Sequence, residues 1–515
     1  MQLEKFELEQ TGGFSPLFLD YISKKSSISP YYNQFPDLEG FENVIKSRKF
    51  EKNKRETLVA SLQKQYEGLS NIPDFSILLD ERCFTVTTGH QLNLFTGPLY
   101  VIYKIVSTIN LALQLKKQFP DYHFVPVYWM ASEDHDFEEI NHFNLFNKTY
   151  SWQTDQKGAV GRMDCREITA ILNEMPEKVA LFEDAYCNSE NLSKAVLKYM
   201  HALFGAKGLI SFDADDAGLK SEFKAIIKKE ILGSDTLKQV ELYSENIEKL
   251  GYKTQVKARE INFFYLDKGL RERIVKENDR YQVLNTDLSF SIAEILDLID
   301  SNPEKFSPNV ILRPVYQEVV LPNIAYIGGP AEVVYWLQLK GVFDQFEVQY
   351  PIVMPRNFAI YINSATKKRM AKLGMSTAEL WNDEQEIKKN YIAKNSEISF
   401  DLADEKAEIA AVFEKILQKA IAIDKSMEGA VLAEKQKTIN AVESQEKRVK
   451  KVEERIHETG IGQLIALKSK LFPNGGPQER SDNFLNFYLN NPEFINQLFD
   501  VFDPLDFRFN LLEED

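Results

Sequence analysis

Two short apolar stretches, each followed directly by polar residues and separated by one helical stretch, most restrict how this chain can fold. The first stretch, 82–88, reads RCFTVTT and stops at Gly89, and the second, 124–130, reads FVPVYWM and stops at a charged cluster. Between them, residues 99–115 carry apolar side chains at spacings of three and four. Strand, helix and strand in this order predict a βαβ unit.

Later apolar runs repeat the pattern, and we predict four further strands of the same sheet at 208–212, 309–312, 324–327 and 352–354. Helical stretches lie between or beside these runs. The fold class predicted is therefore α/β, with a Rossmann-like, doubly wound, mainly parallel sheet. In such sheets ligands bind beyond the carboxyl ends of the strands, so the polar residues that follow each strand should meet at one edge.

Residues 1–375 form the predicted core, and two inserts interrupt its alternation of strands and helices. The first insert, at about 150–205, is rich in turns, and the second, at about 219–305, is charged and mixed. Within the second insert, FFYL at 263–266 is predicted to be a short strand. We expect both inserts to form subdomains beside the core.

Residues 376–460 are predicted to form a coiled-coil arm, because apolar side chains recur there at spacings of three and four with Glu and Lys between them. Glu446 falls where an apolar residue would be expected. The helices pair either within the chain or between two chains, and we favour pairing between two chains because so long an arm needs a partner surface. The C-terminal segment, 461–515, turns at 473–477 and should then fold back on the body, since its aromatic residues would otherwise be exposed.

Length and composition indicate an ordinary globular protein with more than one structural unit. The chain has 515 residues, 44% hydrophobic and 27% charged. Its three cysteines, Cys83, Cys165 and Cys187, are too far apart for a local zinc site or a disulfide framework, which indicates a reducing compartment. No leader pattern and no run of about 18 apolar residues occurs, so we expect a cytoplasmic protein with no membrane contact. A net charge of −15 argues against nucleic acid as a partner.

The first polar cluster, TTGHQLNLFTGPLY at 87–100, links a predicted strand to a predicted helix. Its glycines allow a ligand to approach the backbone, and the N–H groups at the start of the helix favour an anion such as phosphate. His90 could stabilise charge on a transferred phosphate. The pattern is neither a Walker A loop nor GxGxxG, and an ordinary tight turn with a locally bonded histidine is the alternative.

The second cluster, Glu133 to Asp136, directly follows a predicted strand. Its three acids and one histidine could hold a substrate amine, bind Mg²⁺ through carboxylates or supply a general base. The alternative is a helix cap, and carboxylate crowding at a strand end favours function over it. Zinc binding by His135 and His142 is rejected because their spacing lacks the HExxH geometry.

The third cluster spans 313–332 and contains Arg313, a Gly328-Gly329 pair and Glu332. Arg313 could hold a carboxylate through two parallel hydrogen bonds, and the glycines let a ligand approach the backbone before Glu332 opens a helix. An ordinary loop with an acid at the start of a helix is an equally good interpretation of this stretch alone.

At these clusters the chain resembles the bacillithiol biosynthesis cysteine-adding enzyme family, also called cysteine ligases. The resemblance covers nearly the whole chain and rests on four motifs in order: TTGHQLNLFTGPLYVIYKI, PVYWMASEDHDFEEINH, RPVYQEVVLPNIAYIGGPAEVVYW and LFPNGGPQER. It implies a core similar to class I aminoacyl-tRNA synthetases, two connecting inserts and a coiled coil used for homodimerisation. The implied reaction joins the carboxyl of L-cysteine to the amine of glucosaminyl-malate, with ATP activating the carboxyl group.

Two departures from these patterns stand out. Typical members of the family have Gln where this chain has His90, which makes the segment more similar to the HIGH signature of the wider synthetase class. The lysine-rich KMSKS loop of that class is missing, and only Arg356, in the sequence Met-Pro-Arg-Asn, could replace it.

The predicted site residues fall into three sets. The predicted catalytic residues are His90, Glu133, Asp134, His135 and Asp136. The predicted substrate-binding residues are Gln91, Tyr100, Lys104, Arg313, Tyr316, Gln317, Glu332 and Arg356. The predicted nucleotide-binding residues are Thr88, Gly89, Thr96, Gly97, Gly328, Gly329, Asn474 and Gly475. No dedicated metal site is predicted, and Mg²⁺ stays open as a companion of ATP.

Arg313, Arg356 and Lys104 are the candidates for holding the two carboxylates of malate. Two other functions compete with this interpretation. One is a different adenylate-forming ligase or nucleotidyltransferase, and the other is a coiled-coil scaffold that binds a metabolite without turnover.

Overall fold

The protein is described by a computed structural model that covers residues 1–396 and 401–514. It divides into two compact units. The first unit consists mainly of Leu3–Ile360 and Gly476–Leu512, and the second mainly of Tyr361–Gly475. In the sequence, the first unit therefore consists of one segment before the second unit and one segment after it.

The centre of the first unit is a five-stranded parallel sheet with the order β13-β12-β2-β3-β6. The predicted βαβ unit is confirmed as β2 (Cys83–His90), α4 (Tyr100–Gln118) and β3 (His123–Met130). Three of the four further strands are also confirmed, as β6 (Ile210–Asp213), β12 (Asn323–Gly328) and β13 (Ile352–Pro355). The order places β2, β3 and β12 next to one another at the middle of the sheet.

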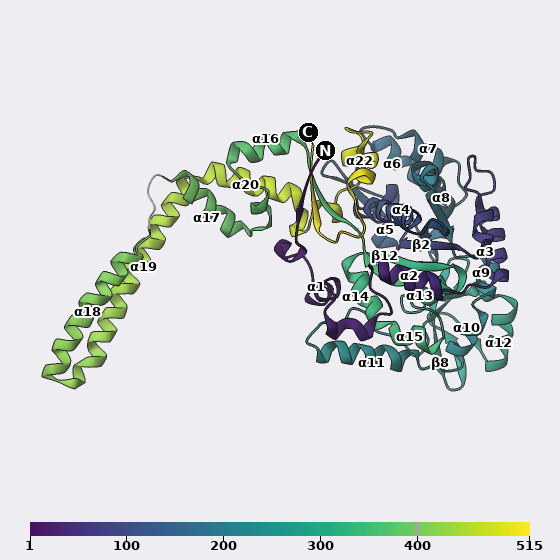
Figure 1. The fold of residues 1–515 in the computed structure, drawn as a ribbon, viewed down its shortest axis with the longest axis horizontal. Helices are drawn as coiled ribbons and strands as arrows, with labels where there is room; N and C mark the ends of the chain where they lie inside the picture. Colours follow the sequence, from purple (N-terminus) through teal and green to yellow (C-terminus); the bar gives the residue numbers. More distant parts are fainter. Residues whose placement is uncertain (397–400, 515) are drawn as a thin grey trace. The chain divides into compact units, whose positions relative to one another are not determined.

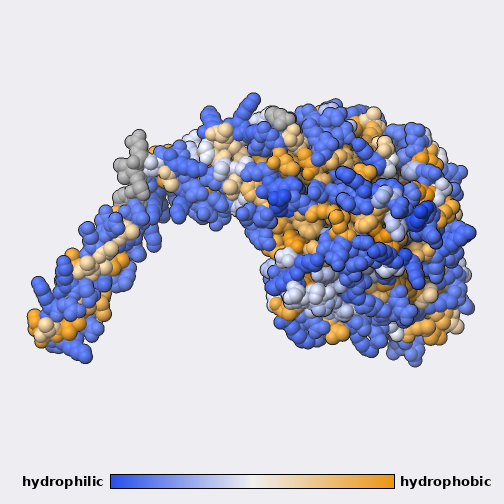
Figure 2. Space-filling view, in the orientation of Figure 1, coloured by the Kyte–Doolittle hydropathy of each residue, from blue (hydrophilic) through white to orange (hydrophobic). Residues whose placement is uncertain are grey.

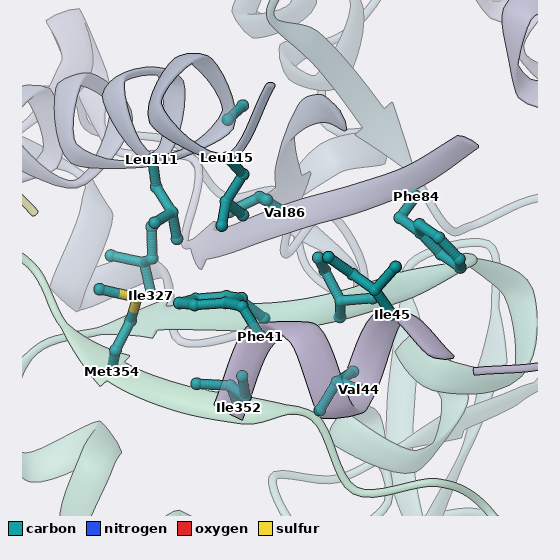
Figure 3. Packing of buried hydrophobic residues seen from close by; sticks show 13 residues of the cluster. Phe41, Val44, Ile45, Phe84, Val86, Leu111, Leu115, Ile327, Ile352 and Met354 are labelled. Carbon is teal, nitrogen blue, oxygen red and sulfur yellow. The ribbon is translucent and has the colours of Figure 1, made fainter. Parts of the chain in front are cut away.

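One face of this sheet is covered by helices α2 (Leu38–Ser47) and α4. Figure 3 shows Phe41 and Ile45 of α2, together with Leu111 of α4, packed with Val86 of β2 and Ile327 of β12. All of these side chains are at most 5% exposed. Because successive strand residues point to opposite faces, the apolar residues at alternate positions of β2 form this core while their neighbours face the other side.

The opposite face of the sheet packs on α13 (Arg313–Val320) and α14 (Pro330–Gln338). Trp129 of β3 contacts the ring of Tyr316 at 5.6 Å between ring centroids, and Tyr326 of β12 stacks on Trp336 at 4.6 Å. In Figure 1, α4 and α8 (Leu192–Phe204) lie above β2 and β12, and α13 and α14 lie below them. Helices on both faces leave only the strand ends accessible, so the loops there must form any ligand site.

A second, antiparallel sheet with the order β10-β9-β8-β7-β11 occupies the end of the predicted 219–305 insert. Its strands are β7 (Phe263–Asp267), β8 (Leu270–Glu277), β9 (Arg280–Val283), β10 (Ser289–Phe290) and β11 (Phe306–Pro308). The prediction of a strand at 263–266 is confirmed. The prediction of a parallel-sheet strand at 309–312 is wrong, because Asn309 accepts hydrogen bonds from the backbone N–H groups of Ile311 and Leu312 and turns the chain into α13.

The remaining elements of the first unit lie around these two sheets. The helices are α1 (Pro16–Ile22), α3 (Lys52–Gln65), α5 (Phe137–Ile140), α6 (Thr169–Glu174), α7 (Ala180–Cys187), α9 (Ala217–Ser221), α10 (Lys224–Ile231), α11 (Thr236–Lys249), α12 (Ile292–Ser301), α15 (Lys340–Gln345), α21 (Leu485–Tyr488) and α22 (Phe494–Val501). The two small remaining sheets are the hairpin β4 (His142–Leu145) with β5 (Lys148–Ser151), and β1 (Gln2–Phe6), β15 (Phe509–Glu513) and β14 (Phe358–Ile362) in the order β1-β15-β14.

The second unit is helical. Its helices are α16 (Ser364–Leu373), α17 (Glu384–Asn395), α18 (Ala403–Ile423), α19 (Glu428–Ile456) and α20 (Glu458–Leu471). The expectation that the long helices pair between two chains is corrected, since α18 and α19 form a hairpin within one chain. Glu446 is buried in this hairpin because its carboxylate accepts hydrogen bonds from Lys406 of α18 and Lys450 of α19. Among the described residues, no helix combines the length and apolar character needed to cross a bilayer.

Candidate active site

Two adjoining cavities open at the carboxyl ends of β2, β3 and β12. They share four lining residues, Trp129, Ala131, Val310 and Arg313. The first, called here the His90 cavity, measures about 440 Å³, and the other residues that line it are Gly89, His90, Gln91, Tyr100, Lys104, Glu139, Tyr326, Gly329, Pro330, Ala331, Glu332, Tyr335, Arg356 and Arg480. The second, the Arg271 cavity, measures about 430 Å³, and its other lining residues are Met130, Ser132, Glu133, Asp134, His135, Asp136, Lys257, Arg259, Ile261, Phe263, Phe264, Arg271, Arg273, Pro308 and Asn309. All three predicted polar clusters therefore contribute to one composite site.

An ion pair between Lys104 and Glu332 forms the floor of the His90 cavity. The Lys104 ammonium donates to the backbone carbonyl of Gly89 at 2.7 Å and lies 2.5 Å from a Glu332 carboxylate oxygen. Glu332 also accepts hydrogen bonds from the Tyr326 hydroxyl at 2.6 Å and the Gly329 N–H at 2.7 Å. Burial alone would raise the pKa of Glu332, but Lys104 and these donors outweigh it and lower that pKa. Glu332 is thus a fixed anion that joins β2, α4 and α14.

His90 is the last residue of β2 and is a neutral hydrogen-bonding group. Its Nδ1 lies 3.2 Å from the Gln91 carbonyl oxygen, which only accepts, so Nδ1 carries the proton. Its Nε2 then accepts from the Tyr100 hydroxyl at 2.9 Å. Burial, followed by the charge of Lys104, lowers the pKa of His90 to about 4. At neutral pH the imidazole therefore brings no positive charge to the site.

This low pKa predicts a measurable dependence of folding stability on pH. Between the unfolded pKa near 6.5 and the folded pKa of about 4, the unfolded chain binds more protons at His90 than the folded chain does. Stability should therefore fall as pH falls through this window. We expect His90→Gln to reduce the loss of unfolding free energy between pH 7 and pH 5, measured by urea denaturation. Equal losses in the variant and the wild type would contradict this, and His142→Gln, at an exposed histidine, is the control.

The carboxylates after β3 are held by specific partners. Asp134 accepts a hydrogen bond from the Gln91 side-chain amide at 2.9 Å and another from the His135 backbone N–H at 2.8 Å. Glu133 lies 2.5 Å from the ammonium of Lys220, which is fully buried on α9 and also donates to the Phe306 carbonyl at 2.7 Å. Burial raises the pKa of Glu133, and Lys220 opposes part of that increase.

The side chains of Asp134, His135 and Asp136 offer ligand atoms within 4.8 Å of one another. A guanidinium nitrogen of Arg271, however, lies 2.5 Å from His135 Nδ1 and 3.6 Å from an Asp134 oxygen. A cation placed there repels a second one and takes the hydrogen-bonding positions that a divalent ion would need. These three residues do not fit a resident Mg²⁺.

Two arginines, Arg313 and Arg356, line the His90 cavity. Arg313, at the start of α13, lies over the rings of Trp129 and Tyr326, with its guanidinium carbon 5.7 and 5.3 Å from the ring centroids. Arg356 follows β13 and makes two hydrogen bonds to Glu479, at 2.6 and 3.1 Å. The side chains of Arg356 and Glu479 are only 3% and 2% exposed. The segment after Gly476 thus belongs to the site, and Arg480 beside Glu479 lines the cavity.

Several predicted site residues have structural partners and do not line either cavity. Thr88 donates to the Ile327 carbonyl between strands. Thr96 and Gly97 have positive φ values of 72° and 69° and form a buried turn, where the Asn483 side chain donates to the Gly97 carbonyl. This turn therefore packs on the C-terminal segment and does not line either cavity.

Three predicted residues on α13 and β12, namely Tyr316, Gln317 and Gly328, also do not line either cavity. The Tyr316 hydroxyl donates to the Ala214 carbonyl, and Gln317 accepts from Arg313 at 3.1 Å, so Gln317 contacts a cavity residue without lining the cavity. Gly328 lies within β12 next to the lining residue Gly329. Asn474 and Gly475 belong to the second unit, where they form a turn after α20.

The sequence interpretation missed several residues that bear on the site, namely Lys220, Arg271, Arg273, Arg480 and the exposed cavity residues Lys257 and Arg259. Arg271 and Arg273 alternate along β8, so their spacing of two was a usable sign that both face one side. Arg480 stands in a motif that was noted only for its glycines. Lys220 carries no local signal, because only the tertiary fold brings it to Glu133.

A parallel α/β sheet with ligand cavities at its carboxyl edge, followed by a helical hairpin, defines a Rossmann-like small-molecule-binding protein with a coiled-coil domain. Two family models match this chain: "Bacillithiol biosynthesis BshC, N-terminal Rossmann-like domain" over residues 1–357, and "Bacillithiol biosynthesis BshC, C-terminal coiled-coil domain" over residues 359–514. The chain belongs to the BshC family of bacillithiol biosynthesis.

Curated relatives match along their whole length. A protein of Flavobacterium psychrophilum named "Putative cysteine ligase BshC" is 44% identical over 532 residues, with 100% of both chains covered. A protein of the same name from Cytophaga hutchinsonii is 40% identical over 513 residues, covering 99% of this chain and 98% of its own. A third, from Flavobacterium johnsoniae, is 40% identical over 530 residues, covering 99% and 100%.

Proposed function

We propose that the protein joins the carboxyl group of L-cysteine to the amine of glucosaminyl-malate, forming the amide bond of bacillithiol. The observation that carries this proposal is the mixed charge of the composite site. In a chain of net charge −15, the two cavities bring together three carboxylates after β3 and a set of lysine and arginine side chains. A substrate that carries both an amine and carboxylates needs partners of both signs.

We further propose that ATP activates cysteine. A carboxylate is a poor electrophile until one of its oxygens becomes part of a leaving group. Attack of the cysteine carboxylate on the α-phosphorus of ATP would give a cysteinyl adenylate and pyrophosphate. Attack of the amine on the adenylate would then give the amide and AMP, with one proton released. Gly89, Gly329 and Arg480 line the His90 cavity, and we propose that they receive the phosphates there.

Glu133 is the group we propose as acceptor of the amine proton. Asp134 and Glu332 have both carboxylate oxygens in hydrogen bonds. Asp136 and Glu139 are exposed. Among the described residues that line the cavities, Glu133 is the carboxylate that is 12% exposed and has a second oxygen without a hydrogen bond. A partly desolvated carboxylate with a raised pKa is a suitable general base.

The direct test uses the purified full-length protein with L-cysteine, glucosaminyl-malate and ATP. We expect a thiol of the ligated mass and one pyrophosphate per product, and we expect Asp134→Ala and His90→Ala to slow its formation. Ligation to other amines with equal pyrophosphate release would favour a different adenylate-forming ligase. Binding of the substrates without turnover would favour the scaffold. Wild-type rates in both variants would remove the proposed site.

We also propose that the helical hairpin pairs with a second copy of the chain. Apolar side chains remain exposed on it, including Ile423 at 89% and Ile456 at 72%. Figure 2 shows such residues interrupting the hydrophilic surface of the hairpin. Exposed apolar residues along one arm support a contact between two copies. Light scattering of the full chain and of an Ile423→Glu/Ile456→Glu variant would separate a dimer from a monomer.

A further inference from the structure

We infer that the Arg271 cavity is the subsite for the dicarboxylate end of the amine substrate, and that Arg273 and Arg313 bind its two carboxylates. This inference rests on the function proposed above and assigns one part of the substrate to one part of the site. It differs from the assignment of these carboxylates to Lys104 and Arg356, because both of those cations already have carboxylate partners, Glu332 and Glu479.

Two arginines that line the Arg271 cavity have guanidinium groups available to a ligand. Arg273 lies on β8, is half-buried, and makes no ion pair or side-chain hydrogen bond with any described residue. Arg313 donates from Nη1 to Gln317, but its Nη2 is fully buried with no hydrogen-bond partner in the described part of the chain. A buried guanidinium N–H without an acceptor is costly, which indicates that a ligand supplies the acceptor.

Strand β8 presents two arginines to the Arg271 cavity. Arg271 and Arg273 are two residues apart on β8 and therefore point to the same side of the strand, and Phe264 of β7 is the cross-strand neighbour of Arg273. Arg271 lies over the Phe264 ring at 4.0 Å and is fixed by Asp134 and His135. The strand thus presents one engaged arginine and one free arginine to the cavity.

The lining of the Arg271 cavity carries charges of both signs. The second sheet contributes cations, while the end of β3 contributes Glu133, Asp134 and Asp136. A polyphosphate would leave these three carboxylates without a positively charged partner. A molecule with an ammonium or amine at one end and two carboxylates at the other matches both sides, with its amine toward Glu133 and its carboxylates toward Arg273 and Arg313. The 219–305 insert, which carries β8, would therefore determine which amine is accepted.

The experiment compares Arg273→Gln and Arg273→Lys with wild type, using glucosaminyl-malate and an analogue in which one malyl carboxylate is a methyl ester. We expect Arg273→Gln to raise KM for the diacid about tenfold to a hundredfold, as for loss of a charged hydrogen bond. KM for cysteine and ATP should change less than about twofold, as measured in the same assay. With the ester, wild type and variant should be alike, and Arg273→Lys should recover part of the affinity. Arg280→Gln, on the neighbouring strand β9, is the matched control, since Arg280 bonds to Ser289 outside the cavity.

Several results would overturn the inference. These are equal losses for the diacid and the ester, a rise in KM for cysteine in place of the diacid, or no effect of Arg273→Gln. Calorimetric titration with the diacid alone separates the subsite from the reaction. Binding to wild type that is weakened in Arg273→Gln supports the subsite even if no ligation occurs, whereas no binding to a folded wild type overturns it.

Discussion

Replacing Glu479 by Ala should lower the free energy of unfolding of the first unit by about 3–5 kcal/mol, the cost of removing one partner from a buried ion pair. Glu479 accepts two hydrogen bonds from Arg356 and one from the backbone N–H of Ala359, at 3.0 Å. Its loss leaves a guanidinium that is 3% exposed without a counter-charge. Urea denaturation followed by tryptophan fluorescence, to which Trp129, Trp152 and Trp336 of the first unit contribute, would measure the change.

A double replacement tests the stated cause. Arg356→Met/Glu479→Leu removes both charges and fills the space with apolar side chains, so it should recover most of the lost stability. An equal loss in the single and double variants would show that side-chain packing, not the unpaired charge, is responsible. A loss below about 1 kcal/mol in Glu479→Ala would show that water reaches Arg356.

Replacing Glu133 by Gln should lower kcat for ligation by about 10²- to 10⁴-fold, the usual contribution of a general base. The amide keeps the shape of the side chain and its contact with Lys220 but cannot accept the amine proton. KM for cysteine and ATP should change little. Rapid-quench measurement of product formation with saturating substrates would give kcat, and Glu241→Gln, at an exposed position of α11, is the matched control.

The dependence of the rate on pH gives a second readout of the same base. The pKa of Glu133 is raised by burial and by Asp215 and lowered by Lys220 and Arg271. The rate should therefore fall on the acid side at a pH above the ordinary glutamic acid value. Removing the Lys220 charge should raise the Glu133 pKa further, so Lys220→Met should move this fall to higher pH. An unchanged pH profile in Lys220→Met, with Lys228→Met as control, would assign Lys220 a purely structural role.

The parallel sheet could be predicted because its signals are local. Strand β2 is a run rich in β-branched residues and β3 is mainly apolar, both stop at polar residues, and the helix between them shows the spacing of three and four. The prediction of a strand at 309–312 used the same kind of local signal, a short apolar run, and was wrong. Three of its four residues are apolar, and Ile311 and Leu312 are buried, but Asn309 satisfies the following N–H groups and starts a helix.

The site was predictable only in part. Strand ends in a parallel sheet meet by topology, so His90, Asp134 and Glu332 could be expected at one edge. Which groups are free, however, depends on partners far away in the sequence. Lys104 is neutralised by Glu332, whereas Arg273, a cation without a carboxylate partner among the described residues, lies on a sheet that is not part of the core. The pairing of α18 with α19 in one chain was likewise undecidable, since the same seam serves both arrangements.

The order in which the chain is synthesised matters for this protein. Arg356 is made before the helical unit, and its partner Glu479 is made after it. A nascent polypeptide that ends within the hairpin therefore contains β13, Gly89 and Gly329. Its Arg356 has no counter-charge, and the wall of its His90 cavity is incomplete. Proteolytic fragments that end before Glu479 should lose affinity for a ligand of the His90 cavity even when their sheet is intact, so quality control during translation can act on a species that is nearly folded yet inactive.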